Sequence, residues 1–456
     1  MSATVERDEG VRGAFAEDAS GLRLVPEGVA RPARAEEVAE VVREAAAAGA
    51  AVTPAGSQTS TTAASITDAG VLLSLRAMDR VLDVDPRSRT MRVEAGALLS
   101  DVKRAAAAHG LFFPPDPTSE ESSTVGGAVA CNASGARTLR YGPTRAHVRG
   151  LTVVLASGET HELRRTPLEK NTVGYALAQD PVDWFVGSEG TLGVVVAAEL
   201  ALQPLPAFVT GLALPFASEQ AALAFVTAAR DASAQGLGAR CLEYFDALAI
   251  GITREAYGDR LAPPSAAALV YAEHAGEREA DLDAWLVLAE AHHAVVDDVR
   301  VFEGDGPLRE AREARHAVPA TMNERGARFR EAGGRKVSTD WAVPYHRLAE
   351  AIGEARALAD EAGVAQAVTY GHAGNGHPHQ NFLARTRDEL ARVERVVEET
   401  LRVVLGMGGT VAAEHGIGKL KRKWLPLQAT PLQLGVMRAV KRELDPKGMF
   451  APGNVL

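Results

Sequence analysis

Cysteine is scarce in this sequence. Its 456 residues include two cysteines, Cys131 and Cys241. Two cysteines cannot supply the disulfide framework of a small secreted domain, and such sparse use is typical of chains kept in a reducing compartment. The first fifteen residues also lack the apolar core of a secretory signal. We therefore expect a cytoplasmic protein that is stabilised by a hydrophobic core rather than by disulfides.

Long hydrophobic runs and an excess of positive charge are also missing. No apolar stretch approaches the roughly 18 residues that a membrane span requires, so any membrane contact would be peripheral to the inner face. The net charge of −10 argues against a nucleic-acid partner. One local exception is the basic segment KLKRKW at residues 419–424. It is either a solvated helix face or a docking patch for an acidic surface.

The common nucleotide-binding signatures are absent as well. No GxGxxG opens a helix after a strand, and no GxxxxGK[ST] occurs. Two other glycine-rich segments stand in the N-terminal half, at residues 114–142 and 187–193. Their backbone amides, together with serine and threonine hydroxyls, can bind phosphate oxygens without a lysine. Each segment alone is explained equally well as a surface loop, but two of them favour one long ligand that both contact.

The pattern of apolar residues predicts an α+β protein. Valines and alanines at helical spacing predict a helix over residues 34–49 that stops at Gly49. Further helices are expected at 98–109 and 388–405, strands at 51–53, 71–75, 91–95, 194–198 and 268–272, a loop at 54–64, and a hairpin at 151–163. Pro204 and Pro206 mark a boundary. Beyond it, alanine-rich helices alternating with strands predict an antiparallel sheet with helices on one face, and the tail from 443 to 456 should wrap back over the body.

Three histidines crowd into the segment YGHAGNGHPHQNF at residues 370–382. The glycines and the proline between them exclude a helix, and on a strand His377 and His379 would share one face. A second segment, AEHGIG at 413–418, places a carboxylate beside an imidazole. Two imidazoles and one carboxylate suit a divalent ion such as zinc or manganese, which lowers the pKa of a bound hydroxyl. A neighbouring neutral histidine could then accept the proton.

Six motifs in order carry a resemblance to a known family. They are PPDPTS at 114–119, TVGGAVACNASGARTLRYG at 124–142, GSEGTLGVV at 187–195, GHAGNGHPH at 371–379, AEHGIGKLK at 413–421 and LDPKGMFAPG at 444–453. The chain resembles the FAD-binding oxidoreductases of the vanillyl-alcohol-oxidase (PCMH-type) superfamily. Its motifs are most similar to the branch of D-lactate dehydrogenase, glycolate oxidase and D-2-hydroxyglutarate dehydrogenase. The resemblance extends over residues 20–456.

The resemblance implies a two-subdomain PCMH-type FAD-binding domain at 1–205, a substrate (cap) domain at 206–410, and a C-terminal segment, 411–456, that returns to the first domain. It also implies noncovalent FAD, since the first loop holds no histidine. The positions that match the FAD contacts of the family are Pro54, Gly56, Ser57, Gln58, Thr59, Asp116, Pro117, Ser119, Gly126, Gly127, Asn132, Gly135, Glu189, Gly190 and Val195.

The same resemblance implies oxidation of a D-2-hydroxy acid, D-lactate or glycolate first, by hydride transfer to flavin N5. Its metal ligands would be His372, His379 and Glu414, and its base would be His415. Arg315 and Lys336 would bind the substrate carboxylate, with Arg312 and Arg335 near enough to replace them, and Asn381 would lie on the substrate side. His377 is left open as a fourth ligand, a substrate contact or a polar neighbour. Electrons would pass to a quinone, a cytochrome or an electron-transfer flavoprotein.

The chain departs from the family at three places. Its first loop, Pro54-Ala-Gly-Ser-Gln-Thr59, has one glycine where relatives carry RGxGTG. Position 319 is proline where some relatives carry a hydroxyl, which argues against the substrate pocket of the hydroxyglutarate enzymes, and Ala451 replaces the asparagine of an NPG motif. Three other functions stay open: a non-redox transferase resembling alkylglycerone-phosphate synthase, a flavin-free metallohydrolase, and a non-catalytic subunit of an oxidase. A homodimer is open too.

Overall fold

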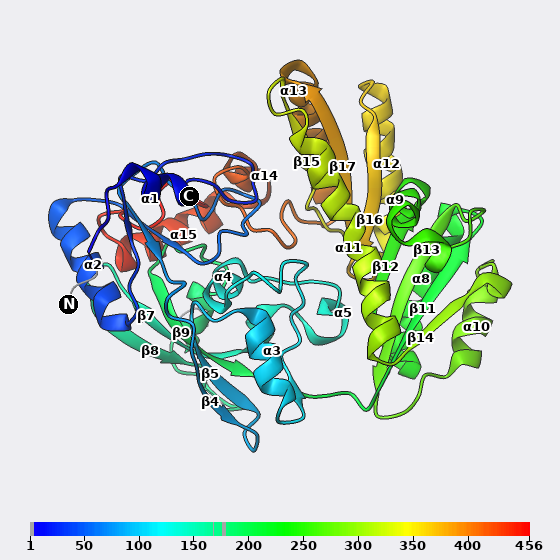
Figure 1. Cartoon of the computed structure of the whole chain (residues 1–456), viewed down its shortest axis with the longest axis horizontal. Helices are drawn as coiled ribbons and strands as arrows, with labels where there is room; N and C mark the ends of the chain where they lie inside the picture. The colour runs from blue at the N-terminus through cyan, green and yellow to red at the C-terminus, as the bar shows by residue number, and fades with distance from the viewer. Residues whose placement is uncertain (1–3, 167, 176–178) are drawn as a thin grey trace. The chain divides into compact units, whose positions relative to one another are not determined.

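The computed structural model describes residues 4–166, 168–175 and 179–456 and divides into two compact units (Figure 1). Unit 1 comprises Met1–Gly135, Gly142–Leu205 and Glu414–Leu456, and unit 2 comprises Ala136–Tyr141 and Pro206–Ala413. The mixture of helices and antiparallel sheet confirms the predicted α+β class. Within the described ranges, none of the helices has the length and apolar character needed to cross a membrane.

A small parallel sheet lies at the N-terminal end of unit 1. Its strand order is β1 (Gly28–Ala30), β3 (Val71–Ser74) and β2 (Val52–Ala55). The helix predicted before β2 is confirmed as α2 (Ala35–Ala48), which buries Val38, Val41, Val42 and Ala45 and ends at Gly49 with a left-handed φ of 65°. The loop expected from Pro54 is wrong at its start, because Pro54 and Ala55 still pair with β3. The loop itself therefore begins at Gly56.

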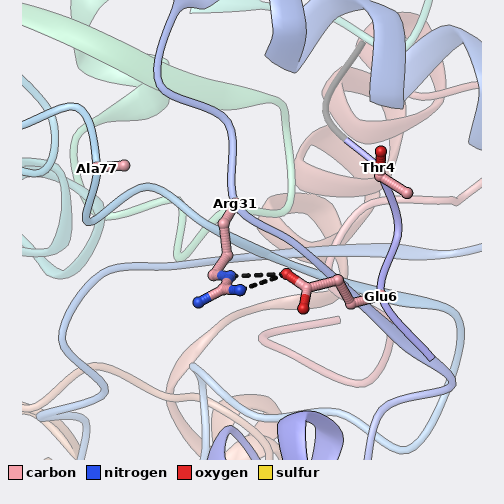
Figure 2. Close-up of a pocket in the computed structure, with 4 residues that line it drawn as sticks. All are labelled: Thr4, Glu6, Arg31 and Ala77. Atoms are coloured by element: carbon pink, nitrogen blue, oxygen red, sulfur yellow. Dashed lines mark hydrogen bonds and ion pairs between the residues drawn. The ribbon is translucent and has the colours of Figure 1, made fainter. Parts of the chain in front are cut away.

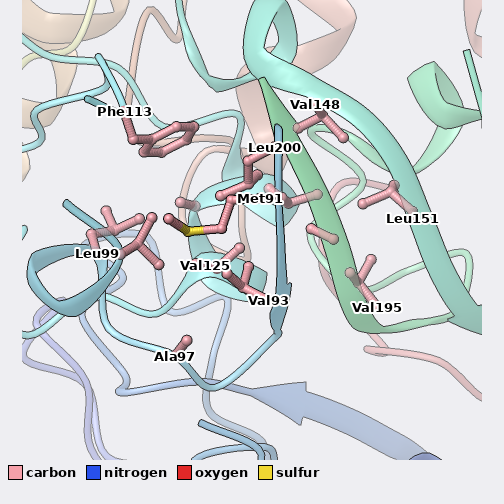
Figure 3. Close-up of a cluster of buried hydrophobic side chains, with 14 of the residues drawn as sticks. Met91, Val93, Ala97, Leu99, Phe113, Val125, Val148, Leu151, Val195 and Leu200 are labelled. Atoms are coloured by element: carbon pink, nitrogen blue, oxygen red, sulfur yellow. The ribbon is translucent and has the colours of Figure 1, made fainter. Parts of the chain in front are cut away.

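The larger sheet of unit 1 is antiparallel and supports the main core. Its order is β4 (Val81–Asp85), β5 (Thr90–Glu94), β9 (Val194–Ala201), β7 (Val148–Val154) and β8 (Thr160–Arg164). Figure 3 shows part of this core, where Met91 lies among Leu99, Phe113 and Val125. Burying each such side chain contributes about 1.5–3 kcal/mol. The predicted hairpin is confirmed by β7 and β8.

The remaining elements of unit 1 are short or flank these sheets. They are α1 (Glu9–Ala14), α3 (Leu99–Ala107), β6 (Leu111–Phe112), α4 (Val125–Cys131), η1 (Thr144–His147), α7 (Val182–Phe185), β10 (Gln203–Pro204), η7 (Arg422–Trp424), α14 (Leu425–Gln428) and α15 (Pro431–Leu444).

The C-terminal segment belongs to unit 1, as the red elements beside the blue and cyan ones in Figure 1 indicate. The amide of Val52 in β2 donates to the carbonyl of Met449, and the amide of Ala451 donates back to Val52, both at 2.9 Å. Phe450 between them is 1% exposed and lies in the core beneath α2. The prediction that the tail wraps back over the body is confirmed for this unit.

Unit 2 is built on one antiparallel sheet. Its strand order is β14 (Arg300–Glu303), β11 (Phe208–Phe216), β13 (Ala268–Gly276), β12 (Ala239–Asp246), β16 (Gln366–His372), β17 (His377–Thr386) and β15 (Gly333–Ser338). Its helical segments are α5 (Thr138–Tyr141), α8 (Glu219–Ala232), η2 (Ser233–Leu237), α9 (Ala247–Tyr257), η3 (Gly258–Arg260), α10 (Leu282–Ala291), η4 (Val296–Asp298), α11 (Asp305–Ala327), η5 (Tyr345–Arg347), α12 (Leu348–Glu361), η6 (Ala373–Asn375) and α13 (Arg387–Gly406).

Helices pack on both faces of this sheet, which differs from the expected single layer. Phe216 of β11 contacts Phe225 of α8, with ring centroids 5.4 Å apart. Gly211 of the same strand faces the other way, where a Cβ would lie 3.1 Å from Leu308 of α11. Since side chains alternate between the faces of a strand, α8 and α11 cover opposite faces. The alanine-rich pattern did not reveal this, because it marks helices without assigning them to a face.

Candidate active site

The three histidines lie on neighbouring strands of unit 2. The chain leaves β16 at His372, turns through η6 and enters β17 at His377. The turn needs Gly376, which has a φ of 67° and whose Cβ would lie 2.0 Å from the carbonyl of Val343. His377 and His379 share a face of β17, as predicted, with ring centroids 4.5 Å apart. One ring nitrogen from each histidine lies within 4.8 Å of those of the other two.

A buried carboxylate orients His372. Its Nδ1 lies 2.8 Å from Oε1 of Glu243 on β12, and Glu243 is 2% exposed. A carboxylate accepts the bond, so the proton is on Nδ1. In the neutral ring the lone pair is then on Nε2, which is the arrangement found in metal-binding histidines. His377 has its own carboxylate neighbour, since its Nε2 lies 3.2 Å from Oδ1 of Asp340. That contact favours the polar-neighbour interpretation of His377.

The contacts of the arginines separate Arg315 from its two alternatives. Arg315 on α11 lies 3.5 Å from the Glu243 carboxylate, beside the histidines. Arg312 instead donates to Glu273 at 3.1 Å, and Arg335 pairs with Glu394 of α13 at 3.0 Å. Arg315 thus lies beside the cluster, whereas Arg312 and Arg335 pair with other carboxylates. Within α11, Pro319 cannot donate to the carbonyl of Arg315, because proline has no amide hydrogen.

A second buried carboxylate supports the same sheet face. Glu273 accepts a bond from Arg240 at 2.7 Å and one from Tyr271 at 2.9 Å, in addition to Arg312. Burial alone would raise the pKa of Glu273, but the guanidinium groups of Arg240 and Arg312, with two others nearby, outweigh it and hold the pKa well below its ordinary value. Glu273 is therefore ionised at neutral pH and fixes the arginines.

Lys336 and Asn381 lie on the same sheet face as the histidines. In the pairing of β15 with β17, Lys336 is opposite Leu383 and Ser338 is opposite Asn381, and paired residues share a face. The Lys336 ammonium donates to Asn323 at 2.8 Å, and burial lowers its pKa to about 8. Asn381 is fully buried and donates to the carbonyl of His379 at 3.3 Å, while its Oδ1 has no hydrogen-bond partner among the described residues.

The first glycine loop of unit 1 is closely packed. A Cβ on Gly56 would lie 2.1 Å from Oγ1 of Thr124, so only glycine fits there. Gln58 has a φ of 56°, a conformation that favours glycine. Its side-chain amide offsets that strain by donating to the carbonyls of Phe15, Glu17 and Ser65 at 2.9, 3.1 and 3.4 Å. Gln58 thereby stabilises a loop that relatives build with glycines.

Several of the expected cofactor residues hold the loops in place. A Cβ on Gly135 would lie 2.3 Å from the carbonyl of Asp116, and the Gly126 amide donates to Ala95 at 2.7 Å. Asn132 ends α4 with a φ of 51°, and its side chain accepts from the Arg145 amide at 2.9 Å. The other members that shape these turns are Thr59, Pro117, Ser119, Gly127 and Gly190.

The hydroxyl of Ser57 indicates whether the first loop fits a phosphate-bearing cofactor. Its hydroxyl is buried and has no hydrogen-bond partner within the described ranges. A buried hydroxyl without a partner among the described residues fits a ligand with acceptor oxygens. Two other expected contacts lie on strands. Pro54 is part of strand β2, and the side chain of Val195 packs in the core shown in Figure 3.

Glu189 has a role that the sequence did not reveal. Both oxygens of its carboxylate accept backbone hydrogen bonds at 2.7 Å, one from Ile417 and one from Gly418. These amides follow His415 in the AEHGIG segment, whose His415 carbonyl also accepts from the hydroxyl of Thr62 at 3.3 Å. The Glu189 side chain thus holds the backbone of the C-terminal segment.

Glu414 stands where the chain passes from unit 2 to unit 1. The preceding residue, Ala413, donates its amide to the carbonyl of Asp340 at 2.8 Å. Glu414 follows Ala413 directly, and consecutive Cα atoms are about 3.8 Å apart. Glu414 is therefore one residue away from a hydrogen bond to Asp340, the carboxylate partner of His377.

A surface pocket elsewhere in unit 1 contains none of the residues predicted for a site. It is lined by Thr4, Glu6, Arg31 and Ala77, and Figure 2 shows Arg31 and Glu6 pointing toward each other. Nε of Arg31 donates to Glu6 at 2.9 Å. This ion pair satisfies both charges, so the pocket offers no convergent group for chemistry.

Comparisons with known proteins agree with the motifs. Residues 205–455 match the family described as FAD linked oxidases, C-terminal domain, and residues 26–164 match the FAD binding domain. Glycolate oxidase subunit GlcD of Bacillus subtilis is 31% identical over 94% of this chain and 89% of its own length. D-lactate dehydrogenase of Anaerostipes hadrus is 29% identical with the same coverage, and D-2-hydroxyglutarate dehydrogenase of Stutzerimonas stutzeri is 30% identical over 94% of this chain and 91% of its own.

The fold has a solved counterpart. A structure of alkyldihydroxyacetonephosphate synthase covers 98% of this chain and 82% of its own, with a TM-score of 0.73 and 18% identity. At that identity the likeness concerns the fold alone. The C-terminal family covers more than half of the chain and the GlcD relative covers nearly all of it. The chain therefore belongs to the FAD-linked oxidases, with an FAD-binding domain of the PCMH type followed by the C-terminal domain of that family.

Proposed function

We propose that this chain oxidises a D-2-hydroxy acid, D-lactate or glycolate first, to the corresponding 2-oxo acid. The observation that carries the proposal is the histidine cluster of unit 2, in which Glu243 fixes the proton of His372 on Nδ1. Polar side chains in such numbers on one buried sheet face are costly unless a ligand engages them. The names of the relatives, glycolate oxidase and D-lactate dehydrogenase among them, support the same class of substrate.

The proposed metal ligands are His372, His379 and Glu414. Two imidazole nitrogens and one carboxylate suit zinc or manganese and leave positions for a substrate. A bound divalent ion would lower the pKa of the substrate hydroxyl. The tautomer that Glu243 imposes on His372 fits this role, because a metal ligand must present a lone pair.

The remaining groups divide the work on the substrate. Arg315 and Lys336 would bind its carboxylate, and the amide of Asn381 would contact its oxygen atoms. His415 would accept the hydroxyl proton. The loops at 54–59, 114–135 and 187–195 would hold FAD noncovalently, and FAD would supply the acceptor for the C2 hydrogen as hydride. Electrons would then pass to a quinone, a cytochrome or an electron-transfer flavoprotein.

The test is an anaerobic absorption measurement on purified protein, reconstituted with FAD and assayed for metal. We expect D-lactate or glycolate to bleach the flavin, L-lactate to leave it oxidised, and about one divalent ion per chain. A colourless protein that cannot take up FAD contradicts the proposal, and metal without flavin would favour a hydrolase. A yellow protein that no 2-hydroxy acid bleaches would favour the transferase.

A further inference from the structure

Glu189 is a buried carboxylate at the centre of unit 1 that the proposed chemistry does not use. It is 6% exposed and lies in the turn between α7 and β9, with a left-handed φ of 50°. Its own amide donates to Ala130 at 2.9 Å, and the amide of Gly187 donates to Val129 at 3.0 Å, so α4 holds the turn. A residue other than glycine rarely adopts this φ without a compensating interaction.

The compensating interaction joins Glu189 to residues more than two hundred positions away. Its Oε1 accepts the amide of Ile417 and its Oε2 accepts the amide of Gly418, both at 2.7 Å. Gly416 has a φ of 76° and its Cβ would lie 2.8 Å from Oε1 of Glu189. The backbone after His415 therefore lies directly against the carboxylate, with no room for a side chain.

A second residue holds the same segment from its other side. The carbonyl of Thr62 accepts the amides of Lys419 at 2.9 Å and Leu420 at 3.2 Å, and its hydroxyl donates to His415. A Cβ on Gly418 would lie 2.2 Å from the Thr62 carbonyl. Every bond in this set reaches the backbone, so the set fixes the path of the segment.

The backbone amides of Ile417 and Gly418 counter the burial of the Glu189 carboxyl. Burial raises the pKa of its carboxyl, and the two amide donors and nearby lysines act against that increase. A carboxylate that accepts two backbone N–H groups in a buried setting forms charge-assisted bonds, which are shorter and stronger than neutral ones. The two 2.7 Å distances have that character.

We propose that Glu189 is a positioning residue, whose carboxylate holds residues 415–418 so that His415 presents its imidazole in one fixed orientation. The inference rests on the proposed function only in naming His415 as the base. It adds a role to Glu189, which the family resemblance places among the positions that contact FAD. A displacement of about 1 Å at a catalytic group can lower the rate by about 10²-fold, so loss of this clamp should affect the chemical step.

The test compares Glu189→Gln with wild type. The amide keeps the size of the side chain but turns an NH2 toward one of the two backbone donors. We expect faster hydrogen exchange in the peptide that contains Ile417 and Gly418, a fall in kcat of about 10²-fold, a KM within about threefold, and unchanged FAD content. Glu159→Gln, at a 74% exposed hairpin position of the same unit, is the matched control and should match wild type.

Three outcomes would overturn the clamp. Unchanged exchange and kcat would show that the bonds position nothing, and loss of FAD with unchanged exchange would return Glu189 to the cofactor. If Glu189→Gln does not fold, Glu189→Asp, which keeps the charge with a shorter reach, must still speed exchange at these amides. If wild type oxidises no 2-hydroxy acid, the proposed function fails while the exchange data still decide the clamp.

Discussion

Among single residues, Glu243 illustrates how one carboxylate can set the chemistry of its neighbours. It lies on β12, 129 positions before His372, and one of its oxygens accepts a hydrogen bond from Nδ1 of that ring. Arg315 lies 3.5 Å from its other oxygen. Removal of such an outer partner typically lowers metal affinity by about 10–100-fold. We therefore predict that Glu243→Gln weakens zinc or manganese binding by about that factor, measured by competition with a chelating dye. Glu303→Gln, exposed on edge strand β14, should bind as wild type, and equal affinity in both variants would contradict the orienting role.

His415 gives the direct test of the proton acceptor. Substitution by alanine removes the imidazole but keeps the backbone bonds that Glu189 and Thr62 make to its segment. We predict that His415→Ala lowers kcat by about 10²–10⁴-fold while the protein stays yellow. The readouts are dye-linked turnover and the flavin absorption spectrum. Turnover equal to wild type would remove His415 as the base.

The lowered pKa of Lys336 predicts how kcat/KM depends on pH. Burial lowers the pKa of its ammonium to about 8, so the side chain is charged below that pH and neutral above it. A substrate carboxylate binds the charged form, so kcat/KM should fall as the pH rises through about 8. Lys336→Met should show a low kcat/KM without this fall, whereas Lys336→Arg, which stays charged, should move the fall to higher pH. A fall that persists in Lys336→Met would assign it to another group.

At the scale of elements, the β16–η6–β17 turn depends on a glycine that cannot be replaced. Gly376 combines a left-handed φ of 67° with a Cβ position 2.0 Å from the Val343 carbonyl. We predict that Gly376→Ala lowers the free energy of unfolding by at least about 1–3 kcal/mol and reduces metal binding, because the two strands carry the histidines. Gly353→Ala is the matched control. It lies in α12 with no atom within 4 Å of the new Cβ, and should stabilise the chain by about 0.5–1 kcal/mol. Thermal unfolding measures both variants, and equal midpoints would contradict the turn argument.

Some helices and strands could be predicted from the sequence, and others could not. The spacing of Val38, Val41, Val42 and Ala45 predicts α2 within one residue at each end, because one buried helical stripe determines it. The shared face of His377 and His379 follows from the period of a strand alone. The partners of Glu243, Asp340 and Glu189 could not be found in this way, since only the tertiary fold brings each pair together. The second helical layer of unit 2 was missed for the same reason.

For the whole molecule, the order of the chain matters as much as the sheets. The chain leaves unit 1 after Leu205, builds most of unit 2, and returns at Glu414 to finish unit 1. Met449 and Phe450 then complete the core beneath α2, where Phe450 is 1% exposed. Unit 1 is therefore not complete until its last residues are in place, although the loops proposed to hold FAD come from the first two hundred residues.

This arrangement predicts how the two units respond to FAD and to truncation. A ligand that binds only folded protein stabilises it by about 2.7 kcal/mol at one hundred times its Kd. FAD should therefore raise the midpoint temperature of an unfolding transition that belongs to unit 1. Removal of residues 449–456 deletes the bonds to Val52 and the buried Phe450, and loss of such a phenylalanine side chain alone costs about 3–5 kcal/mol. In calorimetry we expect the truncation to lower the midpoint temperature of the FAD-sensitive transition and to leave the midpoint of the other transition unchanged. An FAD-sensitive transition that is unchanged by the truncation would show that the C-terminal residues are not needed to complete unit 1.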